Sequence, residues 1–198
     1  MTAPVLIGLA SPQPGCGKTA VACSLVGDTG VLMPFAGPLK EAGCDILFHF
    51  GVPGAEARRL LYIDKHEVIP QLGVTGRHFL QTLGTDWGRN LINKSIWVDA
   101  WRRRYESATA EDGVSVVVVD DVRFPAEAQL IKDLGGQLWW ISRPVLEPTE
   151  AVHHESEGQL VDSPLIDRVI ANSGTLEQLH EVTLDALRFL QQVVAKRG

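Results

Sequence analysis

The sequence predicts an α/β domain built on a parallel sheet of about five strands, with helices on both faces. Predicted strands alternate with predicted helices along most of the chain, and repeated crossovers of this kind produce parallel sheets. The strongest predicted strand, Val114–Val119, is apolar on both faces, which is typical of a central strand covered by helices. A length of 198 residues suits one such domain with a helical insertion.

Composition excludes several classes of function. The net charge of −6 provides no basic field that would attract nucleic acid, and no apolar run is long enough to cross a membrane. The short first apolar run follows no charged segment, so we expect no signal peptide. Three cysteines without metal-ligand spacing suit a reducing compartment. We therefore expect a cytoplasmic protein without a nucleic-acid or membrane partner, and a homodimer is left open.

The first predicted elements have the pattern of a phosphate-binding loop. A short apolar strand, Val5–Ala10, leads into a loop rich in Pro and Gly, and Lys18-Thr19 open a helix. Backbone N–H groups and the helix dipole favour an anion at such a helix start. Lys18 would reach the β- and γ-phosphates of a nucleotide, and the Thr19 hydroxyl would bind Mg²⁺. The predicted nucleotide-binding residues of this loop are Gly15, Cys16, Gly17, Lys18 and Thr19.

The start of the loop departs from the full Gly-x-x-x-x-Gly-Lys-Ser/Thr pattern. Pro12 stands at the first glycine, and Pro14 removes a backbone donor because proline has no N–H. The alternative interpretation is an ordinary strand–turn–helix corner whose Lys18 is solvated. Cys16 is either an oxidisable thiol or, as we favour, a small residue that fills space.

The middle of the chain predicts a helical excursion from the sheet. Val31–Met33 is the second predicted strand, and Phe35–Lys40 leads from it into a helix. Thr75 is then expected to cap a helix that Gly84 stops, and Thr85 begins another helical piece.

Aromatic residues mark the helix that follows, which Ser95 is expected to cap. Trp97, Trp101 and Tyr105 recur at a spacing of four residues, so their side chains lie on one face. We interpret this face as a helix-packing seam, and a platform for stacked bases is the less favoured alternative.

The second half of the chain returns to the strand–helix alternation. The central strand ends at Asp120-Asp121, a helix is expected from about Ala126, and Gln137–Ile141 is the next strand. The polar stretch Val145–Ser163 is interpreted as a lid. Its His153-His154-Glu155 run lacks the spacing of a metal site, so we expect it to contact substrate instead.

The chain's last strand and helix are predicted from a short apolar run and a capping pattern. The strand Arg168–Ala171 is followed by the capping box Thr175-x-x-Gln178, which starts the last helix. The expected buried face of this helix comprises Leu176, Leu179, Thr183, Leu187, Leu190 and Val194.

Polar side chains gather where the predicted strands end. Ligands of parallel sheets bind at the carboxyl ends of the strands. The polar segments that follow the predicted strands therefore predict a catalytic cleft. Either Asp120 or Asp121 suits a metal-bound water or an acceptor group, while the other caps the following turn. Arginine suits phosphate clamping because its planar fork is bidentate and always charged. The arginines beside a loop or helix start are Arg77, Arg89, Arg123 and Arg143.

These residues lie in stretches that resemble the bacteriophage deoxynucleoside monophosphate kinases. The most specific stretch is Leu80–Arg89, with the sequence LQTLGTDWGR. The matching stretches cover nearly the whole chain in order: Phe35–Lys40, Gly73–Arg77, Leu80–Arg89, Asp121–Phe124 with Glu127, His154-x-Ser156-Glu157, and Asn172-x-Gly174-Thr175-Leu176.

The resemblance implies transfer of the γ-phosphate of ATP, with Mg²⁺, to a deoxynucleoside monophosphate. The diphosphate product would serve phage DNA synthesis in the host cytoplasm. The resemblance also implies a single P-loop kinase domain over residues 1–198, of the P-loop NTPase type. Its core would comprise residues 1–40, 114–143 and 165–198, with a helical monophosphate-binding insertion at about 41–113 and a lid at about 144–164.

The resemblance assigns roles residue by residue. Lys18 and Thr19 go to the donor site, Asp121 and Arg123 to the catalytic centre, and Arg143 to the hinge of the lid. We count Lys18, Asp121, Arg123 and Arg143 as the catalytic candidates. Thr19, and Asp120 from its place at the strand end, are the magnesium candidates. Asn172, Gly174 and Thr175 join the loop in binding ATP. The acceptor-binding candidates are Phe35, Lys40, Arg77, Thr85, Asp86, Trp87, Arg89, His154 and Glu157.

Two departures from the family pattern leave alternatives open. Pro12 and Pro14 alter the donor loop, and Gly37 stands where an acidic residue is expected, so the accepted base is not predicted. One alternative is another small-molecule P-loop kinase that resembles dephospho-coenzyme A kinase. A second is a nucleotide-binding module without transfer activity.

Overall fold

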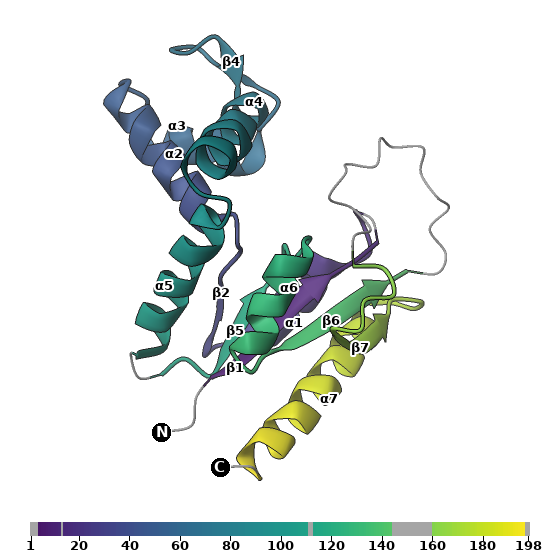
Figure 1. Ribbon diagram of the computed structural model, residues 1–198. Coiled ribbons are helices and arrows are strands. Elements are labelled where there is room, and N and C mark those ends of the chain that lie inside the picture. Colours follow the sequence, from purple (N-terminus) through teal and green to yellow (C-terminus); the bar gives the residue numbers. More distant parts are fainter. Residues whose placement is uncertain (1–3, 13, 111–112, 144–159, 197–198) are drawn as a thin grey trace. The chain divides into compact units, whose positions relative to one another are not determined.

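The protein is described by a computed structural model that covers residues 4–12, 14–110, 113–143 and 160–196 (Figure 1). The chain divides into two compact units. The first combines Met1–Pro34 with Ser107–Gly198, and the second is Phe35–Glu106. The second unit corresponds to the insertion predicted at about 41–113, but both of its boundaries lie several residues earlier in the chain. Within the described residues, no helix is long and apolar enough to span a bilayer.

A five-stranded parallel sheet forms the centre of the first unit. Its spatial order is β2-β5-β1-β6-β7. The predicted α/β fold with a parallel sheet is therefore confirmed. The strands are β1 (Val5–Ala10), β2 (Gly30–Leu32), β5 (Val116–Val119), β6 (Gln137–Ser142) and β7 (Ile166–Ala171). The helices of this unit are α1 (Lys18–Val26), α6 (Pro125–Asp133) and α7 (Leu176–Ala195).

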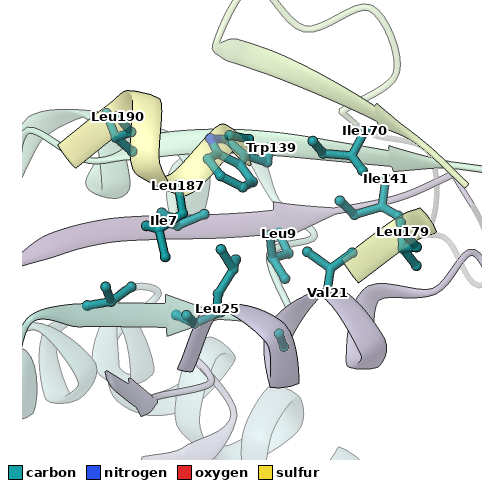
Figure 2. Packing of buried hydrophobic residues seen from close by; sticks show 14 of the residues in the cluster. Ile7, Leu9, Val21, Leu25, Trp139, Ile141, Ile170, Leu179, Leu187 and Leu190 are labelled. Atoms are coloured by element: carbon teal, nitrogen blue, oxygen red, sulfur yellow. The ribbon is translucent and has the colours of Figure 1, made fainter. Parts of the chain in front are cut away.

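Alternation along the strands assigns the helices to opposite faces of the sheet. Ile7 and Leu9 of β1 point to the face that α1 and α7 cover, where they are buried with Trp139 (Figure 2). Gly8, between them, points to the other face. A Cβ at Gly8 would lie 3.3 Å from Ile131 of α6, so the glycine permits this helix to pack closely. Both faces of the central strands are thus covered.

The register brings the carboxyl ends of four strands to one edge. Val119 of β5 pairs with Gly8 of β1, and Ala10 of β1 pairs with Trp140 of β6. The last pair of β6 and β7 is Ser142 with Ala171. The segments that follow β1, β5, β6 and β7 therefore start next to one another, as the sequence predicts for this unit.

The second unit is helical and contains two π-helical segments. Gly84 does not stop a helix, contrary to the prediction, because α4 continues without a break as a π-helix through Gly84 and Thr85. The hairpin of β3 and β4 was not predicted. The elements are α2 (Gly37–His49), α3 (Gly54–Arg58), η1 (Arg59–Ile63), β3 (Val68–Ile69), β4 (Val74–Thr75), α4 (Gly76–Gln81), η2 (Thr82–Ile92) and α5 (Ile96–Ala110), of which α5 ends beyond this unit.

The aromatic stripe of α5 packs inside the protein. Trp97, Trp101 and Tyr105 are all buried. The Trp101 ring contacts Phe35 at a centroid distance of 4.5 Å and stacks on Tyr105 at 5.4 Å. The prediction of a packing seam is confirmed.

The predicted apolar face of α7 is correct in its middle and wrong at its two ends. The face buries Leu179, Thr183 and Leu187 as expected, but Leu176 is 67% exposed and Val194 is also exposed. Leu176 is the first residue of the helix, directly after the cap Thr175, and its side chain is largely in water.

Two alanine variants of α7 test this assignment of the face. Leu179→Ala should lower the free energy of unfolding by about 2–5 kcal/mol, because it opens a cavity in the core beneath α1. Leu176→Ala should change it by less than about 0.5 kcal/mol, since the side chain is largely in water. Chemical denaturation followed by circular dichroism measures both, and equal losses would contradict the assignment.

Candidate active site

The loop after β1 has the backbone geometry of an anion site. Gly15 and Gly17 have φ angles of 80° and 102°, a region in which any residue with a Cβ is strained. Gly17 is the N-cap of α1, and the first turn of this helix contains no acidic residue. The first N–H groups of an α-helix have no partner inside it, so this end of α1 can receive a phosphate.

The two residues that end the loop motif lie at the start of α1. Lys18 is half-buried, and its ammonium donates a hydrogen bond to the Ser11 hydroxyl at 2.5 Å. This bond brings the charge back over the loop. Thr19 is exposed. Cys16 is 1% exposed and belongs to the core cluster, so it fills space as expected and offers the loop only its backbone.

Asn172 connects the far end of the chain to this loop. It follows β7, is buried at 7% exposure, and donates its side-chain amide to the carbonyl of Cys16 at 3.1 Å. Its backbone N–H donates to the carbonyl of Ser142 at 2.7 Å. A Cβ at Gly17 would lie only 2.6 Å from the amide nitrogen of Asn172. The loop and Asn172, both predicted to bind ATP, are therefore brought into direct contact.

Gly174 and Thr175 are occupied with starting α7. The Thr175 hydroxyl accepts the N–H of Gln178 at 3.3 Å, and the Gln178 side chain accepts the N–H of Thr175 at 2.9 Å. This is the predicted capping box. A Cβ at Gly174 would lie 2.0 Å from the Gln178 side-chain oxygen, so glycine leaves room for the box. These two residues orient the segment that carries Asn172.

The segment after β5 carries the paired carboxylates. Asp120 and Asp121 are half-buried at the end of the central strand. The buried Glu127 carboxylate accepts the backbone N–H groups of Arg123 at 2.8 Å and Phe124 at 3.1 Å. Glu127 thereby fixes the backbone at Arg123, whose side chain is exposed.

Sequence reasoning noted Glu127 in a family stretch but assigned it no role. The available signal is its position, because a Glu three residues after the N-cap commonly accepts N–H groups at a helix start. Ser11, the partner of Lys18, had no recognisable signal.

Arg143 follows β6 at the same edge, and its side chain is exposed. The two predicted lid residues, His154 and Glu157, lie outside the described residues. No group of three metal-binding side chains of the His, Cys, Asp or Glu type occurs among the residues that the structure describes.

The remaining acceptor-binding candidates lie in the second unit. Arg77 on α4 is exposed, and Arg89 on η2 is half-buried. Phe35 is buried under Trp101, and the Lys40 ammonium lies 4.6 Å above the ring of Tyr62. Between the two arginines, η2 presents three exposed candidates: Thr85, Asp86 and Trp87.

Arg59, in the same unit, is committed to three carboxylates. Its guanidinium bonds Glu56 at 2.9 Å, Asp64 at 2.6 Å and Glu67 at 2.7 Å. The hydrogen bonds from Arg59 lower the pKa of Glu56 and of Glu67. A phosphate would have to displace these anions, so Arg59 is a structural arginine, unlike the predicted Arg77.

Comparison with known proteins gives a consistent family. A family model described as deoxynucleotide monophosphate kinase matches residues 64–182. A putative deoxynucleotide monophosphate kinase of Acanthamoeba polyphaga mimivirus is 33% identical over 187 residues, which cover 89% of this chain and 92% of that protein. The deoxynucleoside-5'-monophosphate kinase of Escherichia phage T5 is 33% identical over 76 residues, or 38% of this chain and 29% of that protein.

Among solved structures, a dephospho-CoA kinase from Campylobacter jejuni is similar at 13% identity. The match covers 92% of this chain and 95% of that chain, with a TM-score of 0.38. At this score the likeness supports no inference about the site.

Substitution of Gly17 tests whether the contact with Asn172 sets the loop. Gly17→Ala should weaken ATP binding by about tenfold or more, because the new Cβ is strained and displaces the Asn172 amide. Isothermal titration calorimetry measures the dissociation constant.

Gly27→Ala is the matched control at the other end of α1. Gly27 also has a positive φ, 47°, but a Cβ there would meet nothing within 4 Å. This variant should lose some stability and keep the wild-type affinity for ATP. Equal affinities in the two variants would contradict the proposed role of the contact.

Proposed function

The chain belongs to the deoxynucleotide monophosphate kinase family, and on that premise we propose that it transfers the γ-phosphate of ATP to a deoxynucleoside monophosphate. The reaction releases ADP and the deoxynucleoside diphosphate. The observation that carries the proposal is the match with the mimivirus kinase, which extends over 89% of this chain and therefore includes residues of both units.

The loop after β1 would bind ATP, the phosphoryl donor. The N–H groups at the start of α1 and the Lys18 ammonium would hold the phosphates of ATP. The Thr19 hydroxyl and the Asp120 carboxylate offer oxygen ligands, the kind that Mg²⁺ prefers. Bound there, Mg²⁺ neutralises phosphate charge. Asn172 holds the loop in place through the Cys16 carbonyl.

The transfer itself needs an oriented acceptor and compensation of negative charge. Asp121 would orient the attacking phosphate oxygen of the acceptor. Arg123 and Arg143 would bind the transferred group, since bidentate, permanently charged guanidinium groups stabilise the charge that develops on it. The capping contact of Glu127 supports this role, because it fixes the backbone from which Arg123 extends.

The second unit would bind the acceptor. Arg77 and Arg89 suit its monophosphate, and the exposed side chains of residues 85–87 suit its sugar and base. Lys40 lies on the same unit, and the buried Phe35 would shape the site through its packing on Trp101. His154 and Glu157 are proposed to complete it from the lid.

The chemistry and the relatives support a proposal for the biological role. Those named above come from a giant virus and a bacteriophage, and each is named as a kinase of deoxynucleotide monophosphates. We propose that this protein supplies deoxynucleoside diphosphates for viral DNA synthesis in the host cytoplasm.

An assay of ADP release with the four common deoxynucleoside monophosphates, and with modified bases, tests the proposal. At least one acceptor should stimulate ADP release in the wild type. Lys18→Ala should lower kcat by about a hundredfold or more, because it removes a positive charge next to the transferred phosphate. Lys196→Ala, at an exposed lysine after α7, is the control and should leave kcat unchanged. ADP release that no acceptor stimulates would refute the proposal.

A further inference from the structure

The π-helix η2 is the most unusual backbone element of the second unit. It extends over Thr82–Ile92, whereas π-helical geometry is rare and mostly confined to single turns. It carries four of the acceptor-binding candidates: Thr85, Asp86, Trp87 and Arg89. A segment in a rarely populated geometry needs contacts that stabilise it, and their location shows what positions these side chains.

One such contact comes from Trp97, in the first turn of α5. Trp97 is 9% exposed, and its indole nitrogen donates a hydrogen bond to the carbonyl of Gly84 at 2.8 Å. The partners are thirteen residues apart, so this bond joins α5 to the backbone of η2 from outside the π-helix. It fixes both a distance and a direction, which apolar packing alone does not.

Two glycines form the surface on which these contacts are made. A Cβ at Gly88 would lie 2.7 Å from the indole nitrogen of Trp97, and one at Gly84 would lie 2.7 Å from Leu39. Neither position can hold a larger residue without displacing its neighbour. The glycines of the GTDWG stretch therefore fit the indole of Trp97 and the side chain of Leu39.

We propose that Trp97 is a positioning residue for the acceptor. It touches no substrate in this proposal, but it fixes the backbone at Gly84 and Gly88, on either side of residues 85–87. The inference rests on the proposed function, since it assumes that η2 binds the deoxynucleoside monophosphate. Trp101, one turn further along α5, makes ring contacts with Phe35 and Tyr105.

The test is Trp97→Phe, which retains an aromatic ring and removes the N–H donor. The KM for the acceptor should rise roughly five- to tenfold, the effect of losing one buried hydrogen bond, while the KM for ATP stays within about twofold. Hydrogen exchange of the amides in residues 82–92 should accelerate, whereas exchange in α7 should not. A smaller amount of folded protein would not raise the KM for one substrate more than the KM for the other.

Trp139→Phe is the matched control. Trp139 is also buried, and its indole N–H donates a hydrogen bond to the Gln137 side chain at 2.9 Å, but it lies in the sheet of the first unit. This variant makes the same chemical change and should leave the acceptor KM unchanged.

Gly88→Ala provides a second variant, because its methyl group displaces the indole from the side of η2. It should reproduce the rise in acceptor KM and the faster exchange if Trp97→Phe does not fold. Unchanged exchange of residues 82–92 in the folded variants would overturn the inference, as would an acceptor KM that does not change in an active enzyme. A wild-type protein inactive on every acceptor would instead refute the proposed function, and the exchange measurement would still decide the role of Trp97.

Discussion

The hydrogen bond from the Asn172 amide to the Cys16 carbonyl is the constraint on which the loop after β1, the proposed donor half of the site, depends. It joins residues that are 156 positions apart and connects the end of β7 to the loop that follows β1. The amide occupies the space beside Gly17, which a side chain at that position would need. The contact therefore explains why Gly17, the N-cap of α1 with a positive φ, has no room for a side chain. The core beneath it, where Leu179 of α7 meets α1, holds both partners in place.

In the second unit, too, contacts from neighbouring elements support an unusual backbone geometry. There the backbone of η2 takes a rare geometry, and Trp97 and Leu39 pack against the two glycines that permit it. In each unit a large or polar side chain from another element lies on a glycine, and in each the glycine is adjacent to residues proposed to bind substrate. Functional backbone that is unfavourable by itself requires such support from outside.

The fold and the start of α1 at Lys18 were predicted from the sequence because both rest on local signals. Alternation of apolar strands and amphipathic helices defines the sheet, and the Gly-Lys-Thr helix start defines the loop. The contact of Asn172 with Cys16 joins residues too far apart for any periodicity to reveal. The π-helix was missed because Gly84 is usually a stop signal, and the contacts of Trp97 and Leu39 with this segment cannot be inferred from its local pattern. Leu176 was misplaced because helical periodicity puts it on the face of Leu179 but does not show that the first residue of the helix is exposed. The base that the proposed acceptor site accepts was not predicted. Gly37 stands where the family pattern has an acidic residue, and the choice of base depends on individual side chains rather than on the sequence pattern.

The loop after β1 departs from the full phosphate-loop pattern in its first half, whereas the contact with Asn172 lies in its second half. Pro12 and Pro14 lie in its first half, where they reduce the supply of N–H donors. The second half, from Gly15 to the start of α1, has the positive φ angles, the Asn172 contact and the helix dipole. Phosphate binding at a helix N-terminus depends on the N–H groups of the first turn, and these lie in the second half. The two prolines therefore lie outside the half of the loop that is proposed to bind phosphate. The first half contains Ser11, whose hydroxyl accepts the hydrogen bond of the Lys18 ammonium.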